Sequence, residues 1–226
     1  MIDALIFDVD GTLAETEEAH REAFNAVFAR EGLGWNWSVE RYRELLRVTG
    51  GKERIARFLA EEGLTSPPER IAALHGMKNE AYMQIVRSGG APLRPGIAEI
   101  VGDARAAGLK LAICTTTSRV NIETLLDVAF GPEGRAMFPV LVTGEDVRAK
   151  KPDPEAYRLT LARLALPPSR CLALEDSRNG VEAAVAAGVR VIVSPSLYTS
   201  QETFPGAAAI LPDWRGFDWR ELGGAG

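Results

Sequence analysis

Residues 4–12 of the chain read Ala-Leu-Ile-Phe-Asp-Val-Asp-Gly-Thr. Four apolar residues are too few for a helix and are typical of a buried parallel strand, and the Asp-Gly step marks the turn that follows it. Comparable short apolar runs recur at 109–114, 140–142, 171–174 and 189–193, with helical spacing between them at 121–130, 155–166 and 180–187. This alternation predicts an α/β fold, a Rossmann-like doubly wound parallel sheet with helices on both faces.

One segment interrupts the alternation of strands and helices. Residues 15–87 have no strand pattern and instead carry four helical stretches, at 16–31, 39–47, 52–62 and 68–87. We therefore predict that residues 1–14 and 88–226 form a core domain and that residues 15–87 form an inserted α-helical cap domain. Hinges are expected near residues 14–16 and 89–92, where the chain would leave and re-enter the core.

The composition of the chain bounds its partners. It has 226 residues, of which 46% are hydrophobic and 25% charged, as is ordinary for a soluble globular protein. A net charge of −5 argues against a nucleic acid or an anionic membrane as partner, because both require a basic surface. No stretch is apolar enough to cross a bilayer, and the N-terminus lacks a signal-peptide pattern. We expect a monomer in the cytoplasm.

Polar clusters follow four of the predicted strands. They are Asp8 and Asp10 after the first strand, residues 115–118 (Thr-Thr-Thr-Ser) after the second, Lys150-Lys151 after the third and Glu175-Asp176 after the fourth. The carboxyl ends of parallel strands meet at one edge of a sheet, so these clusters should converge. Carboxylates at i and i+2 of an extended segment project to one side, and an oxygen-only site suits Mg²⁺.

The remaining groups suit a phosphorylated ligand. A lysine supplies a fixed positive charge, and hydroxyl and backbone N–H groups at a strand-to-helix turn can bind a phosphoryl group. Any one of these clusters could be a helix cap or a polar loop. We interpret Glu145 and Asp146 as acidic residues of a solvated loop. The four clusters together, in order, favour a phosphate site.

The ordered set resembles the haloacid dehalogenase superfamily, whose motifs are Asp-x-Asp-x-Thr, a Thr or Ser after the second strand, a Lys, and a late acidic pair. The resemblance covers the whole chain, including a cap inserted after the first motif. It implies that Asp8 is the nucleophile and Asp10 the general acid and base. Because dehalogenases lack the second aspartate, Asp10 indicates phosphoryl transfer.

The same resemblance implies the rest of the site. Mg²⁺ would be held by the Asp8 carboxylate, the Asp10 backbone carbonyl and Asp176, with Glu175 in support. The phosphoryl oxygens would be bound by Thr115, Thr116, Thr117 and Ser118. Lys151, rather than Lys150, matches the family's Lys-Pro step and would neutralise charge between the nucleophile and the phosphate.

Cations in the cap segment suggest a second anion site. Residues 50–54 read Gly-Gly-Lys-Glu-Arg and residues 75–78 read His-Gly-Met-Lys. These two stretches resemble the cap of CbbY-type xylulose-1,5-bisphosphate phosphatases, which remove an inhibitor of the CO₂-fixing carboxylase of the Calvin cycle. The resemblance implies a sugar bisphosphate as substrate. The candidate cap residues are Glu17, His20, Tyr42, Gly50, Gly51, Lys52, Arg54, His75 and Lys78.

Three alternatives stay open at the level of sequence. A β-phosphoglucomutase-like sugar phosphomutase has a similar layout, and Thr16, His20 and Lys78 fall about where that enzyme has cap residues that assist its acid–base step. Phosphoglycolate phosphatase is less attractive because so small a substrate needs no second phosphate site. A catalytically inactive relative that acts as a binding module would be expected to have lost Asp8, Asp10 or Asp176, and all three are present.

Overall fold

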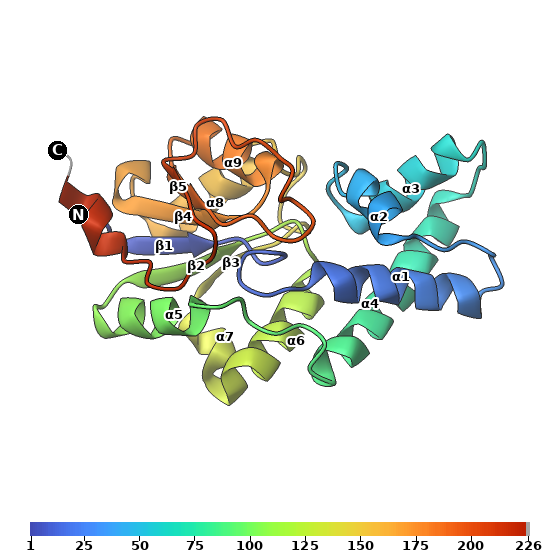
Figure 1. Cartoon of the computed structure of the whole chain (residues 1–226), viewed down its shortest axis with the longest axis horizontal. Coiled ribbons are helices and arrows are strands. Elements are labelled where there is room, and N and C mark those ends of the chain that lie inside the picture. Colours follow the sequence, from blue (N-terminus) through green and yellow to red (C-terminus); the bar gives the residue numbers. More distant parts are fainter. Residues whose placement is uncertain (225–226) are drawn as a thin grey trace.

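The computed structural model describes residues 1–224, built around one parallel sheet (Figure 1). Its strands are β1 (Ala4–Phe7), β2 (Lys110–Cys114), β3 (Val140–Val142), β4 (Cys171–Glu175), β5 (Arg190–Val193) and β6 (Ala209–Ile210). Their order is β3-β2-β1-β4-β5-β6, and every neighbouring pair is parallel. The predicted α/β fold is confirmed, and β1 to β5 lie where the apolar runs placed them. We did not predict β6, because a strand of two residues has no periodic pattern to read.

Helices cover both faces of the sheet. They are α5 (Ile97–Ala106), α6 (Arg119–Phe130), α7 (Gly134–Met137), α8 (Glu155–Leu164) and α9 (Arg178–Ala186), with short 3₁₀ turns η1 (Gly131–Glu133), η2 (Pro168–Arg170) and η3 (Trp219–Gly224). Side chains alternate along a strand, so β1 contributes Leu5 and Phe7 to the cluster with α5 and α6, and Ala4 and Ile6 to the cluster with α8 and α9. This two-sided burial explains the continuous apolar run of β1.

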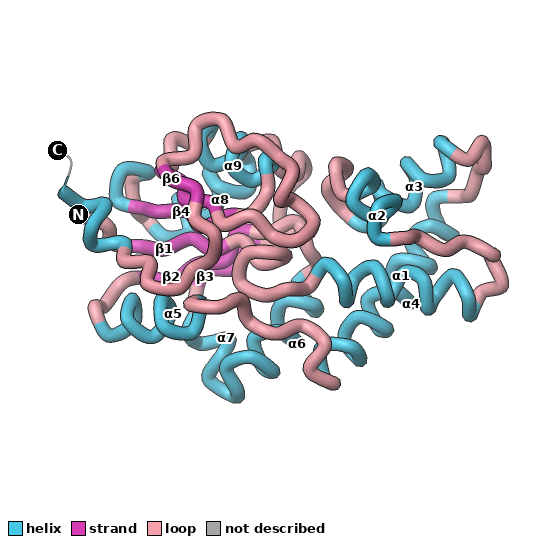
Figure 2. Tube along the Cα trace, viewed as in Figure 1, coloured by secondary structure: helices cyan, strands magenta, loops and turns pink. Residues whose placement is uncertain are grey.

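The segment between β1 and α5 contains helices joined by loops and no strand, as predicted (Figure 2). It contains α1 (Glu17–Arg30), α2 (Val39–Leu45), α3 (Gly51–Glu61) and α4 (Pro68–Arg87). These helices enclose a hydrophobic cluster of their own, in which the rings of Phe24, Phe28 and Trp37 meet in stacked, tilted and edge-to-face pairs. Tyr198, which follows β5, also packs into this cluster. The division into two domains at residues 14–15 and 87–88 stays a prediction.

The two connections between the helical segment and the sheet run side by side. Ala14 and Leu93 form an antiparallel bridge, and the Glu15 N–H donates to the Pro92 carbonyl at 2.9 Å. Arg94 is buried beside them and donates to the carbonyls of Gly11 and Ser194. The sequence-predicted hinges are therefore adjacent in space. Among the described residues, no helix has the length and apolarity needed to cross a membrane.

Candidate active site

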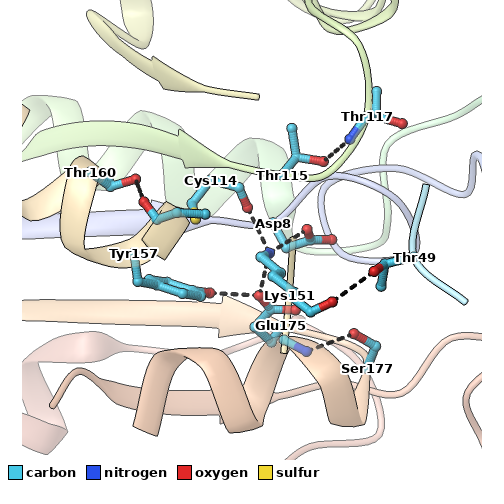
Figure 3. Close-up of polar contacts among 12 residues, drawn as sticks. Asp8, Thr49, Cys114, Thr115, Thr117, Lys151, Tyr157, Thr160, Glu175 and Ser177 are labelled. Atoms are coloured by element: carbon cyan, nitrogen blue, oxygen red, sulfur yellow. Dashed lines mark hydrogen bonds and ion pairs between the residues drawn. The ribbon is translucent and has the colours of Figure 1, made fainter. Parts of the chain in front are cut away.

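Three adjacent strands bring the predicted motifs together at one edge of the sheet. β1 lies between β2 and β4 in register, so Asp8 emerges between the ends of the strands that lead to Thr115 and to Asp176. Lys151 reaches the same point from the loop between β3 and α8 (Figure 3). Convergence follows from parallel topology, because all of these strands end on the same side.

Lys151 is at the centre of the polar contacts. Its Nζ donates to Asp8 Oδ1 at 2.8 Å, to Glu175 Oε1 at 2.7 Å and to the Cys114 carbonyl at 2.7 Å (Figure 3). The lysine is only 3% exposed. Burial disfavours its charge, but the two carboxylates outweigh burial and hold the pKa of Lys151 above its ordinary value. The ammonium is therefore charged at neutral pH, and its contacts orient Asp8.

A buried acidic cluster surrounds the nucleophile candidate. Carboxylate oxygens of Asp8, Glu175 and Asp176 all lie within 4.8 Å of one another. Burial, together with the neighbouring carboxylates, raises the pKa of Asp8 and of Asp176 well above the ordinary value. Glu175 Oε2 is buried without a hydrogen-bond partner among the described residues. A set of oxygen donors with uncompensated charge fits a hard divalent cation such as Mg²⁺.

Gly11 permits this cluster to be compact. Its φ is +80°, and a Cβ at this position would lie 2.3 Å from Asp176 Oδ2. Any other residue would require the Asp176 carboxylate to shift from its place in the cluster. The glycine of the Asp-x-Asp-Gly stretch is therefore needed both for the turn and for the close approach of the second acidic motif.

Asp10 faces the helical segment rather than the acidic cluster. Its Oδ1 accepts from Thr16 Oγ1 at 2.6 Å and from His20 Nε2 at 3.0 Å. Lys78 Nζ donates to His20 Nδ1 at 2.5 Å, so the proton of the imidazole lies on Nε2. Burial and the adjacent Lys78 lower the pKa of His20 to about 4, and burial lowers the pKa of Lys78 to about 7.

This polar chain keeps Asp10 ionised in the structure described. Burial disfavours the charge of Asp10, but His20 and Thr16 hold its pKa below the ordinary value. The side chain of Asp10 is not part of the acidic cluster of Asp8, Glu175 and Asp176. A metal contact of Asp10 through its backbone carbonyl stays a prediction.

A cavity of about 680 Å³ lies between the strand ends and α1, α3 and α4. Most of the sequence-predicted site residues line it: Asp8, Asp10, Glu17, His20, Gly50, Gly51, Lys52, Arg54, His75, Lys78, Thr116, Thr117, Ser118, Lys151 and Asp176. Three predicted residues do not line it, namely Tyr42, Thr115 and Glu175. Each of these three supports a neighbour instead.

The supporting contacts are specific. Thr115 Oγ1 accepts from the Thr117 N–H at 3.2 Å and so shapes the loop after β2. The Tyr42 hydroxyl accepts from Arg54 at 2.8 Å and donates to Glu17 Oε2 at 2.9 Å. Burial raises the pKa of Glu17 to about 7, although Arg54 opposes the shift. Glu175 Oε1 accepts from Lys151 Nζ at 2.7 Å and so helps to hold the lysine in place.

Three contributors to the site were missed or underrated in the sequence. The Tyr157 hydroxyl donates to Glu175 Oε1 at 2.6 Å, and its ring centroid lies 5.2 Å from Lys151 Nζ. Thr199 Oγ1 donates to Asp176 Oδ2 at 3.1 Å. Thr49 Oγ1 donates to the Lys151 carbonyl at 2.7 Å. These residues lie on a helix and in loops, where no strand-end pattern marks them. The one signal for Tyr157 was a hydroxyl on the buried face of a helix, and Thr160 shares that signal.

Comparisons with known proteins agree with this geometry. A family model described as haloacid dehalogenase-like hydrolase matches residues 2–188. Protein CbbY from Cereibacter sphaeroides is 50% identical over 224 residues, which cover 99% of this chain and 95% of the relative. The crystal structure of CbbY from Rhodobacter sphaeroides with phosphate has a TM-score of 0.91 and 51% identity, covering 95% of both chains.

A second solved structure contains a sugar bisphosphate. It is an Asp-to-Asn variant of CbbY from Rhodobacter sphaeroides in complex with xylulose-(1,5)bisphosphate, with a TM-score of 0.91, 50% identity and coverage of 95% of both chains. The family match, the shared fold and the convergence of the four motifs identify the chain as a member of the haloacid dehalogenase-like hydrolases.

Proposed function

We propose that this protein is a Mg²⁺-dependent phosphatase that hydrolyses a sugar bisphosphate, xylulose 1,5-bisphosphate, through an aspartyl-phosphate. The observation that carries the substrate assignment is the likeness, at 50% identity and a TM-score of 0.91, to a CbbY structure in complex with that sugar. In this role the protein would remove an inhibitor of the CO₂-fixing carboxylase of the Calvin cycle. We also propose that it works as a monomer in the cytoplasm; one chain supplies every group of the proposed site, so no second copy is needed to complete it.

The chain's own residues support each step. Asp8, held by Lys151, is the nucleophile that forms a bond to phosphorus while the ester oxygen leaves. Asp10 gives the leaving oxygen its proton and later takes a proton from the attacking water. Asp8, Glu175 and Asp176 would hold Mg²⁺, which when bound offsets the negative charge of the phosphoryl group.

Proton transfer at Asp10 requires a change in its contacts. An ionised Asp10 bound to Thr16 and His20 has no proton to donate. The donors that keep it ionised belong to a polar chain that ends at Lys78, whose pKa is lowered to about 7. We infer that the substrate's leaving oxygen displaces one of these donors, and that Asp10 then takes a proton from solvent and passes it to that oxygen.

The cap residues would hold the second phosphate of the substrate. Lys52 lines the cavity and is exposed, whereas Arg54 is 8% exposed and already bound to Tyr42. His75 lies against Gly51, where a Cβ would come within 2.5 Å of its ring. Of these three residues, Lys52 is the exposed one, and among the described residues its charge is not held by buried neighbours. A substitution of Lys52 is therefore the simplest to interpret.

The experiment compares Lys52→Ala with wild type on two substrates. We expect the KM for xylulose 1,5-bisphosphate to rise by about tenfold, as for loss of a charge-assisted contact, while turnover of p-nitrophenyl phosphate stays unchanged. Arg57→Ala, at an exposed position on the same helix, is the matched control. Equal losses on both substrates would refute a role for Lys52 at the second phosphate.

Two further measurements test the wider proposal. A panel of sugar mono- and bisphosphates, with both phosphate release and isomerisation followed, separates a phosphatase from a sugar phosphomutase and from a phosphoglycolate phosphatase. Asp8→Asn must abolish turnover in the presence of Mg²⁺. A wild-type protein that hydrolyses neither the sugar phosphates nor p-nitrophenyl phosphate would instead be an inactive binding module.

A further inference from the structure

The two adjacent lysines of the loop between β3 and α8 are both held by the segment that starts α3. Thr49 Oγ1 donates to the Lys151 carbonyl at 2.7 Å (Figure 3), and Lys150 Nζ donates to Glu53 Oε1 at 2.5 Å. The partners are 102 and 97 residues apart in the chain. Neither contact involves the two connections near residues 14 and 93, so α3 has its own link to the catalytic loop.

The backbone between the two contacts is shaped to fit them. Gly50 has a φ of +97°, and a Cβ there would lie 2.2 Å from Glu53 Oε2 and 2.4 Å from Lys150 Nζ. A residue with a side chain at position 50 would therefore require Glu53 or Lys150 to shift, and it would also strain the turn. The Gly-Gly-Lys-Glu-Arg stretch therefore has two roles. Gly50 leaves room for the ion pair between Glu53 and Lys150, and the two cations of the stretch line the cavity.

The ion pair between Lys150 and Glu53 contributes little to stability. Its side chains are 22% and 46% exposed, and exposed ion pairs contribute little to the stability of a fold. Its location is more informative than its strength. Lys150 precedes the residue whose ammonium binds both Asp8 and Glu175, so a shift of Lys150 moves the backbone that positions Lys151.

We propose that Glu53 and Thr49 are positioning residues that couple the placement of α3 to the placement of Lys151, and that Lys150 is the partner through which Glu53 acts. The segment that holds the far end of the substrate and the loop that orients the nucleophile would then move as one unit. Substrate bound against α3 would fix Lys151 in the geometry that Asp8 requires. The inference rests on the proposed phosphatase reaction.

A charge swap tests the ion pair. Glu53→Lys and Lys150→Glu are each expected to lower kcat for xylulose 1,5-bisphosphate by about tenfold, a loss typical of a misplaced catalytic group, and the double variant to recover most of it. A direct phosphate ligand would behave differently: Lys150→Glu would raise KM, and the swap would not restore it. The proposal would be overturned if both single variants had a kcat within twofold of wild type. It would also be overturned if the kcat of the double variant were no higher than that of the less active single variant.

The hydroxyl contact has its own test. Thr49→Val should lower kcat without raising KM, and Thr49→Ser should restore it because the donor to the Lys151 carbonyl returns. A purely structural role would lower thermal stability in Thr49→Val and leave kcat of the folded fraction unchanged. That result would remove Thr49 from the proposal.

Controls separate this inference from the substrate assignment. The exposed pair Asp127 and Arg135, outside the cavity lining, receives the same swap and should leave kcat unchanged. All variants are also assayed on p-nitrophenyl phosphate, so a wild type inactive on the bisphosphate refutes the substrate while the kcat comparison still decides the coupling. If a charge-reversal variant does not fold, Glu53→Gln and Lys150→Gln replace it, each with the same expected loss in kcat.

Discussion

Replacing Lys151 by methionine isolates the central ion-pair cluster. The substitution Lys151→Met keeps a long unbranched side chain but removes the ammonium and its three donors. The partners left behind are Asp8 Oδ1, Glu175 Oε1 and the Cys114 carbonyl, all buried. Both carboxylates lose their ion-pair partner in the described structure, but Glu175 Oε1 keeps the hydrogen bond from the Tyr157 hydroxyl.

The expected cost follows from this geometry. Breaking a buried ion pair by removing one partner destabilises a protein by about 3–5 kcal/mol, because a buried charge is left uncompensated. That is a large part of the roughly 5–15 kcal/mol by which a typical domain is stable. We also expect kcat to fall by about 10²–10³-fold or more, as for loss of a group that stabilises charge in the transition state.

The assay is urea-induced unfolding of wild type and variant without metal. Lys110→Met is the matched control, since Lys110 Nζ donates to the Leu164 carbonyl at 2.9 Å and forms no ion pair with a buried acid within the part of the chain that the structure describes. The destabilisation should shrink as pH falls, because protonated carboxyls need no cation. Adding Asp8→Asn to Lys151→Met should recover part of the loss. A Lys151→Met protein within about 1 kcal/mol of wild type would refute the reasoning.

Three further changes are predicted. Tyr157→Phe removes the hydroxyl that donates to Glu175 and should cost about 1.5–3 kcal/mol in urea unfolding; an unchanged midpoint would contradict this. Asp176→Asn should raise the Mg²⁺ concentration for half-maximal activity at least about tenfold while stabilising the metal-free protein, since it removes one of three crowded carboxylates. For Glu17 the folded pKa is raised from 4.5 to about 7, so the folded state retains a proton that the unfolded state releases. Relative to Glu17→Gln, wild type should therefore lose about 2–3 kcal/mol of stability as pH rises from 4.5 to about 7. If the stability of both proteins changed equally with pH, Glu17 would not have the raised pKa.

The alternation of short apolar runs with helical periodicity determined the fold. Each of the five predicted strands lies within one residue of its expected limits, because buried parallel strands have to be apolar on both faces. The same pattern placed Asp8, Thr115 and Asp176 at one edge, since topology makes parallel strand ends converge. Local information sufficed here because each motif directly follows the strand that positions it.

Tertiary structure alone decided which groups touch. Lys151 can bind Asp8, Glu175 and the Cys114 carbonyl only when the loop that follows β3 is packed against the strand ends. Tyr157 contacts the same group from a helix that carries no recognisable motif. Nothing local links Glu53 to Lys150, because 97 residues separate them. Strand-end patterns describe what one segment does by itself, whereas side-chain contacts across such distances depend on how the whole chain packs.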